Sequence, residues 1–350
     1  MSGRKLLQRG EVSLLRDVRK RFDYKDSGII RGIGDDAAVL APLQENILVT
    51  TDMMNEGVHF DLSFSSPFHL GFKLVSVNVS DIYAMGGRPL YVFLDLGLKA
   101  DTDEPFLWDL YDGLSSAMEL YGVKLLGGDL CGVRTDMVIS ATLMGAAGSA
   151  VLRSGASAGD RIYVTGSLGD SACGLEILKR LAPEELEKVR ARRWDKAEPE
   201  LLSSETHGMS RDISSPLLKR HLMPTARDSS LIGKHATSLI DISDGLFIDL
   251  LRVCDESGVG AMIRSKELPL SREMTQAAAE MGLDPFRLAT SGGEDYELLF
   301  TLPREIPAAE LGIAATCIGE ITSEARAFVD EKGERHPLRG EGYQHFGDQG

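Results

Sequence analysis

Acidic residues recur along this chain at the expected ends of strands and helices, most of them in turns that contain glycine. The positions are Gly34-Asp35-Asp36, Thr51-Asp52, Ser80-Asp81, Gly128-Asp129, the run from Asp241 to Gly245, and Gly293-Glu294-Asp295. Glycine allows sharp turns and close backbone approach, and α/β proteins place ligands in the loops that follow strand ends. The pattern therefore favours a fold that gathers several such loops.

Helical and strand patterns alternate between these loops. Apolar periodicity predicts helices over residues 11–22, 68–84, 104–121, 171–181 and 246–254. It predicts strands over 46–51, 91–98, 137–144, 161–165, 238–242, 298–302 and 316–321. This mixed order indicates an α/β (α+β) fold with two mixed-sheet domains rather than a barrel.

The length of 350 residues also favours two domains. Residues 145–160 are rich in Gly, Ala and Ser, so we predict one domain over 1–148 and a second over 149–350. Residues 183–216 are highly charged and weakly apolar, and they are interpreted as a surface helical insertion without evident chemistry.

Charge and cysteine usage limit the partners. The formal net charge of −15 argues against nucleic acid and against an anionic membrane surface. The cysteines at 131, 173, 254 and 317 form no C-x-x-C pair and are interpreted as buried free thiols. Residues 1–10 lack the apolar core of a secretory signal, so we expect a cytoplasmic location.

The acidic loops have few Lys or Arg neighbours in the sequence. Carboxylates that share one space repel each other, and a hard divalent cation would remove that repulsion. Mg2+ prefers carboxylate, water and phosphate oxygens, which suggests a shared site for more than one ion. A single Asp beside Gly is more often a turn or a helix cap, and that alternative stays open for each position.

Common nucleotide motifs are missing. The chain has no Walker A sequence, no G-x-G-x-x-G after a strand, and no protein-kinase catalytic loop. The turn from Gly166 to Gly169 could hold a phosphate at the start of a helix, although a plain strand-to-helix turn explains it equally well.

Taken together, the motifs resemble the thiamine-monophosphate kinases, in the superfamily that includes aminoimidazole ribonucleotide synthetase and selenophosphate synthetase. The matching stretches span about residues 10 to 346 in family order. They are Gly32–Ala37, Thr50–Asp52 with Glu56–Phe60, Asn78–Asp81 with Ala84–Gly86, Gly127–Asp129, Arg153–Ala156, Asp241–Gly245 and Ser291–Glu297. One departure is Asn55, which stands where an apolar residue is usual.

The resemblance implies a role for each matched residue. Metal ligands would be Asp36, Thr50, Thr51, Asp52, Asp81, Asp129, Asp241 and Asp244, with Asp52 and Asp241 essential for catalysis through the metal. The nucleotide would contact Thr50, Gly128, Asp129, Arg153 and Ser243, and the substrate would contact His59, Glu294 and Tyr343. It also implies several Mg2+ ions, ATP as co-substrate, thiamine monophosphate as acceptor, and a homodimer formed through strands of the N-terminal domain.

The acceptor would be a phosphate monoester, which is largely deprotonated at neutral pH and needs no general base. We therefore expect direct in-line transfer of the phosphoryl group without a phosphoenzyme. Two alternatives remain. One is another ATP-using synthetase of the superfamily, although no cysteine precedes the first acidic loop as selenophosphate synthetase would require. The other is a non-catalytic protein that binds divalent ions or nucleotides.

Overall fold

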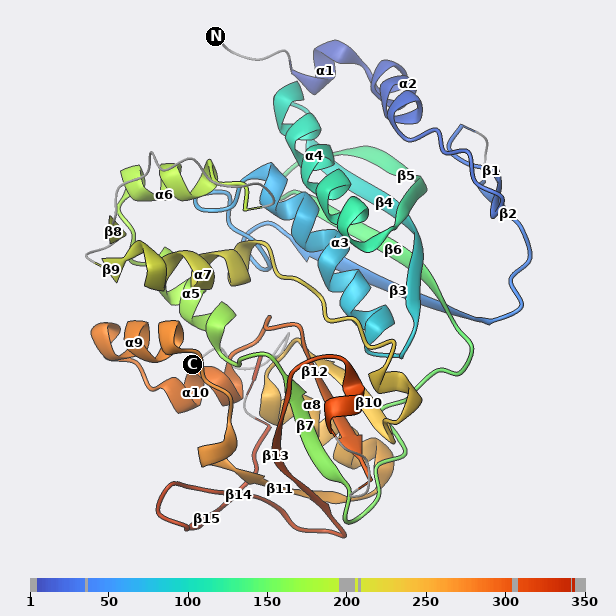
Figure 1. The fold of residues 1–350 in the computed structure, drawn as a ribbon. Helices are drawn as coiled ribbons and strands as arrows, with labels where there is room; N and C mark the ends of the chain where they lie inside the picture. Colours follow the sequence, from blue (N-terminus) through green and yellow to red (C-terminus); the bar gives the residue numbers. More distant parts are fainter. Residues whose placement is uncertain are drawn as a thin grey trace. The chain divides into compact units, whose positions relative to one another are not determined.

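The computed structural model describes residues 5–34, 37–194, 205–206, 209–303, 308–340 and 342–343. Contacts between Cα atoms divide the chain into two compact units. The N-terminal unit comprises Met1–Ile82, Arg88–Gly148 and Leu186–Glu198, and the C-terminal unit comprises Tyr83–Gly87, Ser149–Glu185 and Pro199–Gly350. Figure 1 shows the elements of both units.

The N-terminal unit is built on a four-stranded sheet with the order β3-β6-β4-β5. Its strands are β3 (Asn46–Asn55), β4 (Arg88–Lys99), β5 (Lys124–Val133) and β6 (Val138–Ala147), and only the β4–β5 pair is parallel. Helices α3 (Pro67–Tyr83) and α4 (Glu104–Tyr121) cover one face of the sheet (Figure 1). Shorter elements precede them: α1 (Leu6–Arg9), α2 (Glu11–Arg21), β1 (Ile29–Arg31) and β2 (Val39–Leu40).

The register defines the two faces of this sheet. The row Met54–Ile139–Leu96–Leu130 belongs to the inner face, where the first three side chains are buried. Along β3 the exposed side chains alternate with these, and Ile47, Val49 and Met53 are each more than half exposed. We refer to the face that carries them as the outer face.

The C-terminal unit contains a seven-stranded sheet with the order β10-β12-β7-β13-β11-β14-β15. The strands are β7 (Arg161–Thr165), β10 (Ser238–Ile242), β11 (Gly260–Arg264), β12 (Glu297–Leu302), β13 (Ala315–Thr322), β14 (Arg326–Val329) and β15 (Arg335–Pro337). Only the β11–β14 pair is parallel. Both faces are buried, because Ile162 and Val164 enter one apolar cluster while Tyr163 between them enters another.

The helices of this part of the chain are α5 (Asp170–Leu178), α6 (Pro183–Arg190), α7 (Arg211–Leu222), α8 (Leu246–Ser257), α9 (Arg272–Met281) and α10 (Pro285–Ser291). Short 3-10 turns span Ile232–Lys234, Ser265–Glu267 and Ala308–Leu311, and a small ribbon joins β8 (Glu205–Thr206) to β9 (Met209–Ser210). Among the described residues no helix combines the length and the apolar character needed to cross a membrane.

The predicted mixed α/β class is confirmed, and the helix over 104–121 and the strands over 161–165 and 238–242 have the predicted bounds. Two predictions about the acidic loops were wrong. Asp52 lies within β3 rather than at its end, and Gly127-Gly128-Asp129 lies within β5. Glycine is needed at 128 because its φ is +143° and a Cβ atom would lie 1.8 Å from the carbonyl oxygen of Leu94 on the neighbouring strand.

The predicted surface helical insertion over 183–216 is confirmed in part for its described residues, which form α6 and the start of α7, but some of its side chains are buried. Val189 and Arg192 are buried, and α7 begins at Arg211 with Ile213 buried. Charged residues dominate this segment, so its apolar pattern is not apparent in the sequence. Proline usually ends a helix, yet Pro216 lies inside α7. The prediction of four buried thiols holds for Cys173 and Cys254, whereas Cys131 is exposed and Cys317 is intermediate.

Candidate functional site

Two aspartates lie on the inner side of the N-terminal unit. Asp52 shares its register row with Ala141 and Leu94, which are buried. Burial, together with the negative charge of Asp81 from α3, raises the pKa of Asp52 to about 7. The Thr50 hydroxyl donates to Asp81 Oδ2 at 2.5 Å. Thr50, Asp52 and Asp81 are thus brought together, although they lie up to 31 residues apart in sequence.

This donor set fits a magnesium ion. Two carboxylates and a hydroxyl are the hard oxygen ligands that Mg2+ prefers. Burial, and then the charge of Asp81, disfavour the ionised form of Asp52 in the protein alone. A bound divalent cation would favour the ionised form of both carboxylates.

Other predicted ligands of this unit lie elsewhere. Asp129 shares its register row with Asp95 and Met53, on the outer face. The Thr51 hydroxyl donates to the carbonyl oxygen of Ala141 at 3.1 Å, and Thr51 is exposed on the same face. The structure therefore does not bring the side chains of Thr51 and Asp129 to Asp52. Asp36 lies outside the described residues.

His59 lies in the loop that follows β3. The backbone N–H of Asn55 donates to His59 Nδ1 at 3.1 Å, and the N–H of His59 donates to the carbonyl oxygen of Asn55 at 2.9 Å. Because Nδ1 accepts a hydrogen bond, a neutral His59 carries its proton on Nε2. The side-chain oxygen of Asn55 is buried without a hydrogen-bond partner.

A second acidic region surrounds the loop between β10 and α8. Asp249 Oδ2 accepts the backbone N–H groups of Ser243, Asp244 and Gly245 at 3.1–3.2 Å. Arg252 donates to Asp244 Oδ2 at 2.6 Å and to Asp249 Oδ1 at 2.5 Å. The expectation that the acidic loops lack basic neighbours was wrong here, because Arg252 on α8 pairs with Asp244 of the loop and with Asp249.

Burial raises the pKa of Asp249 to about 6, while the charge of Arg252 and the backbone N–H groups oppose that rise. Three backbone N–H groups and Arg252 thus favour the ionised form of Asp249. Sequence reasoning missed Asp249 and Arg252. The available signal was an aspartate in the first turn of a helix directly after a Ser-Asp-Gly sequence, where it can accept unpaired backbone N–H groups.

Two distant segments of the chain meet at this loop. The N–H of Glu294 donates to the carbonyl oxygen of Ser243 at 2.7 Å, and the N–H of Tyr343 donates to the carbonyl oxygen of Asp244 at 3.1 Å. Asp241 is buried at the end of β10, in register with Leu298 of β12. Ser243, Asp244, Glu294 and Tyr343 are therefore brought together in the C-terminal unit.

The carboxylates of the Gly292–Glu297 motif have separate environments. Asp295 is fully buried and accepts the N–H groups of Gly169 and Ser171 at 2.6 and 3.1 Å. Glu297 is also fully buried, and its partners are Arg220, Arg227 and Thr165. Only Glu294 keeps a substantial exposed fraction, 31% of its side chain. Glu294 is therefore the carboxylate of this motif that can reach a ligand.

The arrangement of Asp295 bears on the proposed phosphate cradle at Gly166–Gly169. Asp295 already occupies two backbone N–H groups at the start of α5, and Leu168 N–H donates to the carbonyl oxygen of Pro269. The carboxyl group of Asp295 takes the place that a phosphate would need. The structure therefore favours the plain strand-to-helix turn.

Arg153 lies at the other end of β10 and α8. The carbonyl oxygen of Leu152 accepts the N–H of Leu239, near the start of β10, and that of Arg153 accepts the hydroxyl of Ser257, the last residue of α8. A helix rises about 1.5 Å per residue, so the 12-residue α8 separates Arg153 from the Asp244 loop. The structure therefore does not bring the backbone of Arg153 to Ser243, the other predicted nucleotide contact of this unit.

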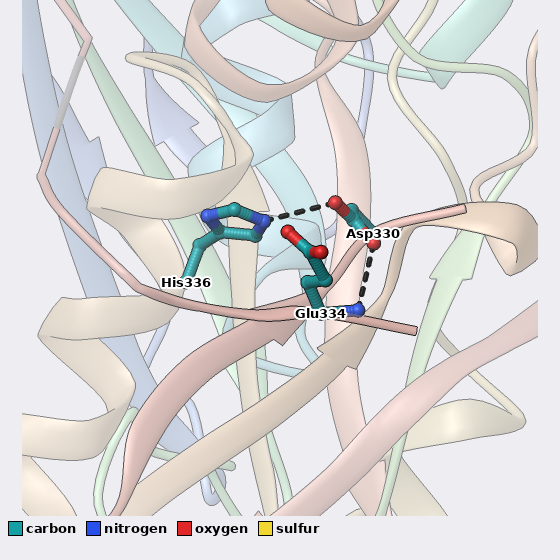
Figure 2. A group of neighbouring side chains, drawn as sticks. All are labelled: Asp330, Glu334 and His336. Carbon is teal, nitrogen blue, oxygen red and sulfur yellow. Dashed lines mark hydrogen bonds and ion pairs between the residues drawn. The ribbon is translucent and has the colours of Figure 1, made fainter. Parts of the chain in front are cut away.

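A further group of possible metal ligands lies at the β14–β15 hairpin. Figure 2 shows Asp330, Glu334 and His336, whose ligand atoms lie within 4.8 Å of one another. Asp330 accepts the N–H of Glu334 at 2.8 Å and lies 2.9 Å from His336 Nε2. The ring of His336 stacks on Phe328 at 5.0 Å. These contacts close the hairpin and account for the group without a metal.

Comparisons with known proteins were made at the level of domains, sequence and structure. The models for the N-terminal and C-terminal domains of AIR synthase related proteins match residues 34–147 and 157–331. Thiamine-monophosphate kinase of Aquifex aeolicus (strain VF5) is 36% identical over 345 residues, which cover 98% of this chain and 100% of the relative. That of Escherichia coli (strain K12) is 36% identical over 349 residues, with coverages of 96% and 98%.

Solved structures that are similar to this chain come from the same family as the sequence relatives. Thiamine-monophosphate kinase from Stenotrophomonas maltophilia K279a superposes with a TM-score of 0.74 at 30% identity, covering 93% of this chain and 96% of that one. AaThiL complexed with AMPPCP and TMP superposes with a TM-score of 0.72 at 34% identity, with coverages of 98% and 99%. The similarity extends over both units and includes the segments that carry the acidic residues.

Proposed function

The chain belongs to the thiamine-monophosphate kinases among the AIR synthase related proteins, and on that premise we propose that it phosphorylates thiamine monophosphate with ATP, forming thiamine diphosphate. The observation that carries the proposal is sequence similarity over nearly the full length of curated kinases. The partly buried pair of Asp52 and Asp81 supports it, because transfer between two phosphates needs a means of neutralising negative charge.

Thr50, Asp52 and Asp81 would hold Mg2+ in the N-terminal unit, and Asp241 and Asp244 in the C-terminal unit. When bound, Mg2+ neutralises phosphate charge and aligns the reacting groups. Asp36, Thr51 and Asp129 remain predicted ligands. The acceptor phosphate is already an anion, so none of these side chains is assigned as a general base.

Glu294 and Tyr343 are proposed to contact thiamine monophosphate beside the Asp244 loop, and His59 is proposed to contribute from the N-terminal unit. Ser243, Thr50, Gly128, Asp129 and Arg153 are proposed nucleotide contacts. In this scheme residues 1–148 bind Mg-ATP, and residues 149–350 complete the site. Because ATP is the proposed co-substrate, we propose that the protein is cytoplasmic.

We also propose a homodimer formed through the outer face of the N-terminal sheet. Ile47, Val49 and Met53 expose apolar side chains side by side on β3, and such patches mark interaction surfaces. Light scattering of the wild type and of Val49→Lys tests this. A wild-type mass of one chain at micromolar concentration would contradict the dimer.

The decisive test is release of ADP with purified protein, Mg2+ and ATP, with and without thiamine monophosphate. Release that requires thiamine monophosphate is expected, whereas release without it would favour another reaction of the superfamily. No release under either condition would favour a non-catalytic binding protein. Direct transfer also predicts that γ-32P-labelled ATP leaves no label on the protein.

A further inference from the structure

The contact between α7 and Glu294 is absent from the functional assignments above. His221, near the end of α7, is buried, and its Nδ1 atom lies 3.3 Å from Glu294 Oε2. The same nitrogen lies 3.2 Å from the hydroxyl oxygen of Ser171 on α5. One imidazole nitrogen therefore joins two helices to the most exposed carboxylate of the Gly292–Glu297 motif.

Close packing of α5 and α7 fixes the place of this imidazole. A Cβ atom on Gly174 would lie 2.2 Å from the carbonyl oxygen of Leu217, so only glycine allows the two helices to approach this closely. The same Cβ would lie 3.3 Å from the Cβ of His221. The preceding residue, Arg220, pairs with the buried Glu297. Leu217 and Arg220 therefore anchor the turn of α7 that leads to His221.

The contact with Glu294 determines which nitrogen of His221 carries hydrogen. An ionised carboxylate only accepts hydrogen bonds, so the contact with Glu294 requires hydrogen on His221 Nδ1. Ser171 then shares this hydrogen as a second acceptor. An Nδ1–H group at this position holds one carboxylate oxygen of Glu294, whose side chain is 31% exposed.

The backbone does not by itself orient this side chain. Glu294 has φ of +67° and Tyr296 has φ of +50°, and the N–H of Glu294 is bound to the carbonyl oxygen of Ser243. These constraints fix the Cα position of Glu294, while its three side-chain torsions stay adjustable. His221 supplies a contact close to the end of the side chain.

We propose that His221 is a positioning residue for substrate binding: its Nδ1–H group fixes the carboxylate of Glu294 in the orientation that receives thiamine monophosphate. The inference rests on the proposed function and deepens it. It predicts an effect on binding of that substrate and not on binding of ATP, because His221 acts through Glu294.

Two amide substitutions separate positioning from general packing. The amide nitrogen introduced by His221→Asn would lie near the position of Nδ1, whereas the longer side chain of His221→Gln places its amide near the position of Nε2. We expect His221→Gln to raise KM for thiamine monophosphate roughly tenfold, as loss of a hydrogen bond to a charged group does, with kcat and KM for ATP within about twofold. His221→Asn should stay within about threefold of the wild type in every constant.

The control is His336→Gln, which removes the imidazole of another histidine–carboxylate pair, at the hairpin in Figure 2. It should leave both KM values unchanged. Equal KM values in the Asn and Gln variants, or a parallel rise in KM for ATP, would overturn the positioning role. The melting temperature of each variant shows whether it is folded under the conditions of the assay.

The proposed function can fail separately. If the wild type releases no ADP in response to thiamine monophosphate, that function is wrong, and the contact is then tested by crystal structures of the wild type and His221→Gln. A carboxylate of Glu294 that keeps its position without the imidazole would overturn the inference as well. A displaced carboxylate would support the positioning role for whichever ligand occupies the site.

Discussion

In the N-terminal unit, burial and the charge of Asp81 raise the pKa of Asp52 to about 7, whereas in the C-terminal unit arginines lie against Asp244, Asp249 and Glu297. The first region gathers negative charge that a ligand must neutralise. The second contains its own cations, which hold the loops in place before any ligand arrives. Similar acidic motifs in one chain can therefore either lack nearby cations or pair with the protein's own arginines.

Glu297 should give the largest effect on folding. Glu297→Gln leaves Arg220 and Arg227 without the charge that balances them, and breaking a buried ion pair costs about 3–5 kcal/mol. Chemical denaturation measures the loss in free energy of unfolding. The exposed Glu331→Gln is the control and should change stability little. A loss below about 1 kcal/mol would remove the assigned stabilising role of the arginines.

Asp52 should show the opposite behaviour. Asp52→Asn removes one of two like charges, so the free energy of unfolding without Mg2+ should stay constant or rise. Turnover should fall roughly 100- to 1,000-fold, because a ligand of the metal is lost. Asp101→Asn serves as the control in the steady-state assay. Near-normal turnover in Asp52→Asn would show that the pair is not part of the reacting site.

Substitution of Arg252 should have a smaller effect on the free energy of unfolding than substitution of Glu297. Arg252→Met should lower the free energy of unfolding by about 2 kcal/mol, since two charge-assisted hydrogen bonds disappear at a partly exposed site. Arg272→Met, at the start of α9, provides a matched substitution. Thermal or chemical denaturation gives the result, and equal stability of the two variants would contradict the role of Arg252.

The pH dependence of the free energy of unfolding should distinguish the wild type from Asp52→Asn. Asp52 has a folded pKa of about 7 against an ordinary value of 3.8, so the folded state binds more protons between those values. Its contribution to stability therefore falls as pH rises from about 4 to 7, by at most about 1.4 kcal/mol per pH unit. Comparing wild type with Asp52→Asn across this range isolates the slope. Saturating Mg2+ should abolish or reverse it, and an identical slope in both proteins would be evidence against the raised pKa.

Local sequence was sufficient to predict the fold class and several elements. The helix over 104–121 has clear apolar periodicity and ends at Gly122 in the left-handed conformation. The strand over 161–165 is short, apolar and followed by glycine. Such signals lie within the element itself, which is why their bounds were predicted well.

The placement of the acidic residues depended on contacts with distant segments. Gly127 and Gly128 have the composition of a turn, yet glycine at 128 is required by the neighbouring strand. Asp129 then falls on the outer face because of strand register, which local sequence does not specify. Likewise Glu294, Asp295 and Glu297 read as one motif, but partners from α5, α7 and β7 divide them into one exposed and two buried carboxylates.

The left-handed backbone at Glu294 and Tyr296 sets a limit on how this loop can evolve. Residues other than glycine, asparagine or aspartate rarely adopt such φ values. Glu294 and Tyr296 are therefore held in this conformation at an energetic disadvantage. Glycine at 294 would relieve that disadvantage but remove the carboxylate. Selection for stability and selection for ligand recognition therefore favour different residues at this position, and a thermostabilised descendant that kept Glu294 would have to gain its stability elsewhere.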